Sequence, residues 1–267
     1  MKSLVLVLVF LAWFATPASA DFDAGMAAYK RGDYVTAFRE LKPLAKQGHA
    51  EAQLRLGVLY ANGGGVPQDF KVAARWFRLA AEQGYAEAQY NLGVLYGKGQ
   101  GVPRDYKETI RWYGLAAEQG YAEAQYNLGV LYAKGEEAPQ DFNAAAHWLR
   151  LAAEQGYAEA QYNLGALYAS GEGVSQDYKE MIRWYRLAAE QGHAPAQGGL
   201  GFMYVLGKGV PQDYVHALMW FNLAVAHLGA TQGYKAVADA RERLASKMTS
   251  SQIKEAERLA REWKPKK

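Results

Sequence analysis

Hydrophobic side chains return along this chain with two periods, a short one typical of helices and a long one of 36 residues. Over residues 86–97, Ala88, Leu92 and Tyr96 fall at helical spacing on one face. Gly93 lies between them and removes a side chain where a second helix can approach closely. The segment therefore predicts a helix that packs tightly against a partner.

A stretch rich in glycine and proline follows and predicts a turn before the next helix. Asp105 is placed as the N-cap of that helix, where its carboxylate accepts from free backbone amides. Glu108 stands at capping-box spacing from it, and Asp177 and Glu180 repeat the pair. Gly120 predicts the end of the second helix. The unit is therefore expected to be a hairpin of two antiparallel helices.

The same unit recurs every 36 residues. A Gln-Gly dipeptide begins at positions 47, 83, 119, 155 and 191, and a tryptophan keeps the same step at positions 76, 112, 148, 184 and 220. A fixed period of this length is typical of a solenoid, in which each unit buries its apolar face only by stacking on its neighbours. The sequence therefore predicts an all-α fold, a right-handed α-solenoid of stacked antiparallel helix hairpins.

The period also divides the chain into parts. We expect a signal peptide over residues 1–20, an N-terminal capping helix pair over 21–48, five repeats over 49–228 and C-terminal capping helices over 229–267. In the last part we expect two helices, over 230–247 and 250–263, and Thr249 and Gln252 stand at capping-box spacing at the start of the second. The repeats are expected at 49–84, 85–120, 121–156, 157–192 and 193–228.

The first residues have the composition of an export signal. Lys2 precedes an apolar run from Leu4 to Ala15, and the small residues Pro17-Ala18-Ser19-Ala20 match a signal-peptidase site with cleavage after Ala20. The alternative is an uncleaved anchor, but about a dozen apolar residues are short of the roughly 20 that span a bilayer. We expect an exported protein, periplasmic or secreted, that is soluble and not inserted in the membrane after cleavage.

The net charge bears on the class of partner, and the cysteine content bears on how the fold is stabilised. The formal net charge is +3, which becomes +2 when Lys2 is removed, and no cationic stripe of the kind that binds nucleic acid is visible. The chain has no cysteine, so folding depends on packing without disulfides. We expect a monomer that does not bind nucleic acid.

The repeat follows the pattern A-x-A-x-x-x-L-G-x-x-Y-x-x-G-x-G-V-x-x-D-x-x-x-A-x-x-W-x-x-x-A-A, which resembles the Sel-one-like repeat (SLR) family, a relative of the tetratricopeptide repeats. The resemblance covers five units from His49 to Leu228. Local departures are Thr109, Met181, Glu137-Ala138 and Val225. The resemblance implies an adaptor or regulator of the bacterial envelope, with a concave face lined by the first helices. From the residues we expect neither catalysis nor a cofactor.

Side chains of the first helices that do not face the helix pair form columns along the array, and we expect them to bind a protein or an extended peptide. Tyrosine offers a large contact area at low entropic cost, and asparagine can both donate to and accept from a peptide backbone. The predicted ligand-binding residues are Glu87, Tyr90, Asn91, Val94, Glu123, Tyr126, Asn127, Val130, Glu159, Tyr162 and Asn163.

Three alternatives stay open. The tyrosine column could instead pack one repeat on the next. It could also stack on sugar rings, with Glu87, Glu123 and Glu159 beside it, as in a binder of carbohydrate or peptidoglycan. A more distant alternative is a hydrolase of the penicillin-interacting type, because Ser251 and Lys254 match S-x-x-K, although neither S-D-N nor K-T-G accompanies them.

The histidines give no indication of a metal site. His49 and His193 stand where other units carry tyrosine, so we expect both to be packing residues, and His147 stands at a position of the helix exterior. No His, Cys and carboxylate cluster has the spacing of metal ligands.

Overall fold

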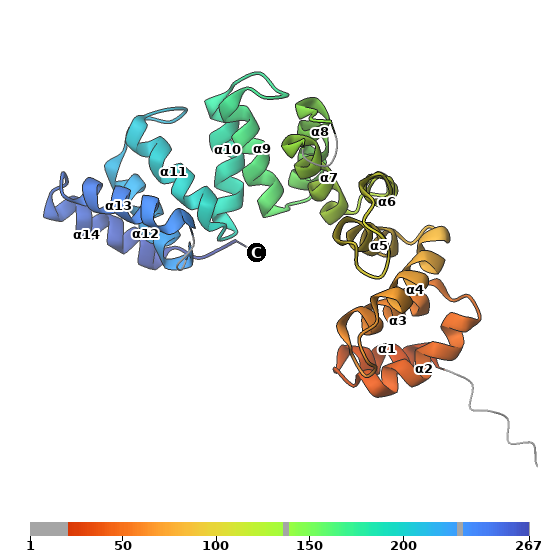
Figure 1. The fold of residues 1–267 in the computed structure, drawn as a ribbon. Coiled ribbons are helices and arrows are strands. Elements are labelled where there is room, and N and C mark those ends of the chain that lie inside the picture. The colour runs from red at the N-terminus through yellow and green to blue at the C-terminus, as the bar shows by residue number, and fades with distance from the viewer. Residues whose placement is uncertain (1–20, 136–138, 229–231, 267) are drawn as a thin grey trace, which may run out of the picture. The chain divides into compact units, whose positions relative to one another are not determined.

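The computed structural model describes residues 21–135, 139–228 and 232–266, and over these ranges it contains fourteen helices and no strand (Figure 1). The predicted signal peptide and the departure at Glu137-Ala138 lie outside the described residues. The helices are α1 (Phe22–Lys30), α2 (Tyr34–Lys46), α3 (Ala50–Asn62), α4 (Phe70–Glu82), α5 (Ala86–Lys98), α6 (Tyr106–Glu118), α7 (Ala122–Lys134), α8 (Phe142–Glu154), α9 (Ala158–Ser170), α10 (Tyr178–Glu190), α11 (Ala194–Leu206), α12 (Tyr214–Leu228), α13 (Gln232–Ala245) and α14 (Ser250–Glu262).

The chain divides into two compact units, residues 1–80 and residues 81–267, with the boundary inside α4. In the first unit, α1, α2 and α3 share a core that includes Leu41, Leu56 and Leu59. In the second, adjacent helices pair as hairpins, for example α5 with α6 and α7 with α8, and each hairpin packs on the next through contacts such as α6 with α7. The predicted all-α array of stacked hairpins is thus confirmed.

The first helix of each repeat has the same length and the same ends. Each runs for 13 residues and is preceded by a tyrosine or a histidine in extended conformation. Each ends at a glycine in the left-handed region, such as Gly99 with a φ of 65°, where a side chain would strain the backbone. The glycine that recurs every 36 residues therefore determines where each of these helices ends.

The second helix of each repeat begins at the predicted aspartate. The Asp105 Oδ1 atom accepts from the backbone amides of Lys107, at 2.9 Å, and Glu108, at 3.2 Å. The amide of Asp105 donates to the carbonyl of Tyr96 at 3.1 Å and so closes the loop between the two helices. The N-cap prediction is confirmed.

The reciprocal half of the predicted capping box at this position is wrong. Because the Asp105 amide is already bonded to Tyr96, the Glu108 carboxylate turns instead to the indole Nε1–H of Trp112, at 2.9 Å, and to Arg111. The same holds for Asp177, whose amide donates to the Tyr168 carbonyl while Glu180 pairs with Arg183.

The glycine of each first helix lies against the second helix of its own hairpin, as predicted. A Cβ atom on Gly93 would stand 2.6 Å from the Tyr113 Cδ1 atom, and one on Gly129 would stand 2.5 Å from the Leu149 Cγ atom. Both distances are too short for carbon atoms in contact, so the close helix approach requires glycine.

The C-terminal helices cover the last hairpin. Thr249 and Gln252 form the predicted capping box at the start of α14. Leu259 of α14 and Trp263, the residue after this helix, pack against a core that contains Trp220 and Leu223 of α12. Over the described residues, no helix is long and apolar enough to cross a membrane.

Candidate functional site

The predicted ligand-binding residues lie on α5, α7 and α9, the first helices of three successive hairpins. We call the surface that these residues form the helix-A face. All of them are partly buried except Glu159, which is exposed. They therefore lie between the closed core and solvent, where a side chain can serve both packing and binding.

The tyrosine rings contact other rings, both within their own hairpin and at the start of the next repeat. Tyr90 lies 5.4 Å from Tyr113 and 5.3 Å from Tyr121, measured between ring centroids. Tyr126 stands 5.1 Å from Tyr157, the residue that precedes the next hairpin. These distances fall within the range of favourable aromatic pairs. Each ring thus contributes to packing of repeat on repeat, as the packing alternative requires.

The third tyrosine of the column has the same surroundings. Tyr162 stacks on Tyr185 at 5.0 Å and lies 5.0 Å from His193. Burial raises the pKa of Tyr185 far above its usual value. The hydroxyl therefore stays protonated at any physiological pH.

The asparagines tie the columns together. The Asn127 Nδ2 atom donates to the Tyr90 hydroxyl at 3.2 Å and to the Glu123 carbonyl at 2.9 Å, and Asn91 donates to the Glu87 carbonyl at 2.8 Å. Both bonds of Asn127 use its amide nitrogen. Its carbonyl oxygen has no donor among the described residues, so it can accept a hydrogen bond from a ligand.

Burial, with a smaller contribution from nearby carboxylates, raises the pKa of Tyr90 and of Tyr126. For Tyr90, burial is the main cause, partly offset by the hydrogen bond from Asn127. For Tyr126, burial is again the largest cause, followed by the charge of Glu159, while Asn163 acts in the opposite direction. The hydroxyls are thus neutral hydrogen-bonding groups rather than acids or bases at physiological pH.

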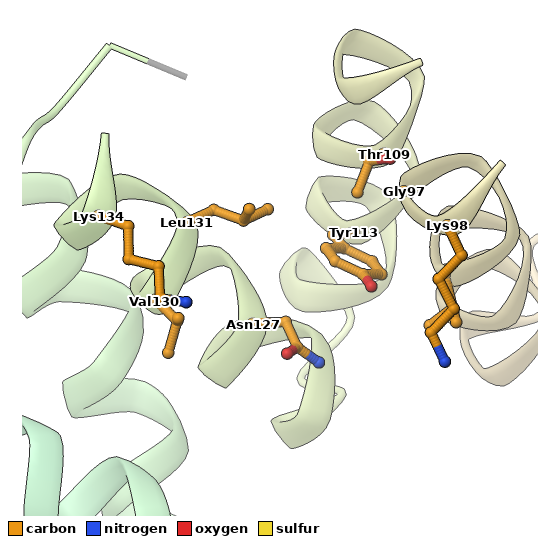
Figure 2. Close-up of a pocket in the computed structure, with 9 residues that line it drawn as sticks. Gly97, Lys98, Thr109, Tyr113, Asn127, Val130, Leu131 and Lys134 are labelled. Carbon is orange, nitrogen blue, oxygen red and sulfur yellow. The ribbon is translucent and has the colours of Figure 1, made fainter. Parts of the chain in front are cut away.

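A pocket of about 230 Å³ opens between the hairpin α5–α6 and the helix α7 (Figure 2). Three of the predicted residues, Val94, Asn127 and Val130, line it. The other lining residues were not predicted, and they are Gly97, Lys98, Thr109, Tyr113, Leu131 and Lys134. Apolar walls with a few polar groups are typical of a binding pocket.

The sequence analysis missed a ladder of buried glutamines. The Gln125 Nε2 atom donates to the Ala117 carbonyl of the preceding hairpin at 3.0 Å, while its Oε1 atom accepts from Gln155 at 2.7 Å. Gln155 also donates to the Gly120 carbonyl. The recurrence of glutamine at positions 53, 89, 125, 161 and 197 was the available signal.

The S-x-x-K residues and the histidines do not gather into a site among the described residues. Ser251 and Lys254 are both exposed on α14. His147 is exposed, as expected, and the rings of His49 and His193 pack against Phe22 and Tyr162. Within the part of the chain that the structure describes, no three His, Cys, Asp or Glu side chains are grouped so that they could hold a metal ion.

The histidines do more than pack. The Nδ1 atom of His49 accepts from the Ala52 amide, and that of His193 accepts from the Ala196 amide, each at 3.2 Å. They cap α3 and α11, a bond that tyrosine cannot make at the corresponding positions 85, 121 and 157.

Comparison with known families gives one result. The model of the Sel1 repeat matches residues 50–85, 86–121, 122–157, 158–193 and 194–227. Each range begins one residue after a repeat boundary expected from the sequence. A comparison with curated proteins finds no match.

Two solved structures are similar over most of the chain. A Sel1 repeat protein from Oxalobacter formigenes is 31% identical with a TM-score of 0.79, and the match covers 91% of this chain and 100% of that one. A protective antigen of uropathogenic Escherichia coli strains that displays an SLR fold is 36% identical with a TM-score of 0.78, and the match covers 89% of this chain. The match covers 51% of the antigen, so this chain spans about half its length.

Proposed function

This chain belongs to the Sel1 repeat family, and from that premise we propose that it is a non-catalytic adaptor or regulator that binds another protein, or an extended peptide, on its helix-A face. The observation that carries the proposal is the pocket between successive first helices. Val94, Asn127 and Val130 line it together, although they come from two different repeats.

The chemistry of this face suits a polypeptide. The valines supply apolar contact, and the Asn127 carbonyl oxygen is an acceptor for a backbone amide. The first helices lie at one repeat spacing from each other, so tyrosine and asparagine recur at matching positions of α5, α7 and α9, while the valine position is alanine in α9. A chain laid across them meets a repeated set of contacts, as peptide-binding solenoids require.

The tyrosine column favours a peptide over a glycan. A sugar stacks on the free face of an aromatic ring, but Tyr90 and Tyr162 each contact two other rings of the protein. Their flat faces are therefore largely occupied. The tyrosines in this proposal hold the repeats in register and present their edges and hydroxyls to the partner.

The proposal includes the place where the protein acts. The apolar run Leu4 to Ala15 and the cleavage pattern that ends at Ala20 support export to the periplasm or beyond. An adaptor of the bacterial envelope would meet its partner there, as a monomer without a cofactor.

Site-specific photocrosslinking in the native envelope tests the proposal. A photoreactive phenylalanine analogue at Val130 is expected to crosslink a defined protein, because this side chain lines the pocket. The same analogue at Leu115, an exposed apolar residue of α6 outside the pocket, is the matched control. A partner captured at Leu115 but not at Val130 would contradict the proposal.

A further inference from the structure

Two lysines give the pocket of the helix-A face a charge of its own. Lys98 ends α5 and Lys134 ends α7, and both line the pocket (Figure 2). In Figure 2 the two side chains come from opposite sides of the opening, with Asn127 between them. Among the described residues that line the pocket there is no aspartate or glutamate. The pocket thus combines apolar walls with two cations.

Neither lysine is neutralised within the described structure. Lys98 and Lys134 are exposed and form no ion pair or hydrogen bond with any described side chain, whereas the lysine at position 266 pairs with Glu190 at 2.9 Å. A free cation beside an apolar wall attracts a carboxylate, because the apolar contact removes water from around the ion pair.

This charge is confined to one junction between repeats. At the next junction, 36 residues on, the second lysine is replaced by Ser170 and the Asn127 position by Asn163. One junction later, the corresponding residues are Leu206 and Gly199. The repeated fold therefore does not by itself require a lysine pair at this place.

Gly97 distinguishes the same junction. The other first helices of the second unit carry Ala133, Ala169 and Val205 at this position. A Cβ atom on Gly97 would stand 3.4 Å from the Thr109 Oγ1 atom and 3.5 Å from its Cγ2 atom, an ordinary van der Waals contact. Close helix packing therefore does not require this glycine. Its missing methyl group enlarges the pocket.

We propose that this pocket recognises an acidic segment of the partner, in which an aliphatic side chain enters between α5 and α7 and flanking carboxylates pair with Lys98 and Lys134. The inference rests on the proposed function and specifies the chemistry of the partner. The backbone amide beside the aliphatic residue donates to the Asn127 carbonyl oxygen, which is the free acceptor at the centre of the site.

Short peptides of defined charge test the inference. Acetylated and amidated Glu-Leu-Glu is titrated into the isotopically labelled protein, and the backbone resonances of residues 94–98 and 127–134 are followed. The neutral control is Gln-Leu-Gln, and the control without an aliphatic group is Glu-Gly-Glu. We expect the acidic peptide with leucine to bind most tightly, and its affinity to fall when ionic strength rises from about 0.01 M to about 0.15 M.

Protein variants locate the effect. Lys98→Gln and Lys134→Gln are each expected to weaken Glu-Leu-Glu roughly 1.5- to 5-fold, as the loss of one exposed ion pair does. Lys107→Gln removes an exposed lysine outside the pocket and should change the affinity little. Gly97→Ala should weaken binding about fivefold or more without lowering the melting temperature, because the methyl group fills part of the pocket and meets Thr109 at an ordinary contact distance, without a clash.

Several results would overturn the inference. Equal binding of Gln-Leu-Gln would show an apolar pocket without acid recognition. An equal loss in Lys107→Gln would show unspecific attraction, and resonance changes confined to other residues, or no binding at all, would place the site elsewhere. If a captured partner loses binding in Val130→Glu but not in the Lys98→Gln, Lys134→Gln double variant, the proposed function stands and the acidic segment falls. Loss in neither variant removes both.

Discussion

At the scale of single residues, the close packing of the two helices of a hairpin requires a glycine in the first helix. Gly129→Ala should lower the free energy of unfolding by about 1 to 3 kcal/mol, because its Cβ atom would stand 2.5 Å from the Leu149 Cγ atom and 3.2 Å from the Ala145 carbonyl oxygen. Urea unfolding of the purified variant measures the change.

Gly114→Ala is the matched control with the opposite expected sign. A Cβ atom on Gly114 meets nothing within 4 Å, so alanine in this helix interior should stabilise by about 0.5 to 1 kcal/mol. If both variants shift stability alike, glycine at 129 is not a packing requirement.

His193 makes stability depend on pH. Burial lowers the pKa of His193 below its usual 6.5, with the charge of Glu159 opposing this, and its Nδ1 atom must stay unprotonated to cap α11. The unfolded chain therefore binds the proton more readily, so this contribution is complete above pH 6.5 and is lost as pH falls below that value. The stability contributed by His193 stops falling once the pH is below the lowered pKa of the folded state.

The variant His193→Tyr isolates this effect, since tyrosine occupies the same position in three other repeats. Melting temperatures measured from pH 7.5 down to about 5 should fall less steeply in the variant than in the wild type. Parallel curves would show that His193 does not titrate on unfolding.

Predictions for single residues were confirmed where the structure depends only on the spacing of residues along one helix or at its start. Gly93 needed only the helical period, and the Asp105 N-cap needed only its place before a helix. The capping box at Glu108 failed because the Asp105 amide is bonded to Tyr96, nine residues earlier in the chain. That bond depends on how the loop closes, which local spacing does not reveal.

At the scale of helices, the buried glutamine ladder joins one hairpin to the next. Gln125→Leu should destabilise the protein by about 1 to 3 kcal/mol, because it removes two hydrogen bonds between hairpins at a buried site, one to the Ala117 carbonyl and one from the Gln155 amide. Thermal unfolding followed by circular dichroism measures this cost.

An exposed glutamine provides the comparison. The Gln176 Nε2 atom donates to the Ala169 carbonyl at 2.7 Å, but water can replace it at this exposed site. Gln176→Leu should therefore change stability by less than about 0.5 kcal/mol. A Gln125→Leu variant as stable as the wild type would mean that the ladder does not hold the hairpins together.

Helix positions could be predicted closely because each boundary has its own residue signal. The expected helix over 86–97 is found at Ala86–Lys98, and the one over 250–263 at Ser250–Glu262. The helix expected over 230–247 ends two residues early, at Ala245, where the repeat pattern no longer marks a boundary, and its expected start lies outside the described residues. The ladder was missed because glutamine at a regular interval looks like a solvated position until burial is known.

At the scale of the whole molecule, the sequence predicted which helices carry the candidate site but not the pocket within it. The 36-residue step placed Val94 and Val130 in one column. Lys98 lies on α5 one turn after Val94, whereas Thr109 and Tyr113 join the pocket only through the packing of α6 against α5 and α7. A contact among three helices depends on their separation, and no periodicity in the chain encodes that distance.

The affinity of the crosslinked partner for two matched variants tests the central claim most directly. Val130→Glu places a carboxylate in the pocket, and Leu115→Glu places the same group on the exposed surface of α6. Binding on the helix-A face predicts that Val130→Glu weakens the partner more than about tenfold while Leu115→Glu binds like the wild type, with the helical spectrum and the melting temperature preserved in both. Unchanged affinity in Val130→Glu together with loss in Leu115→Glu would contradict the account.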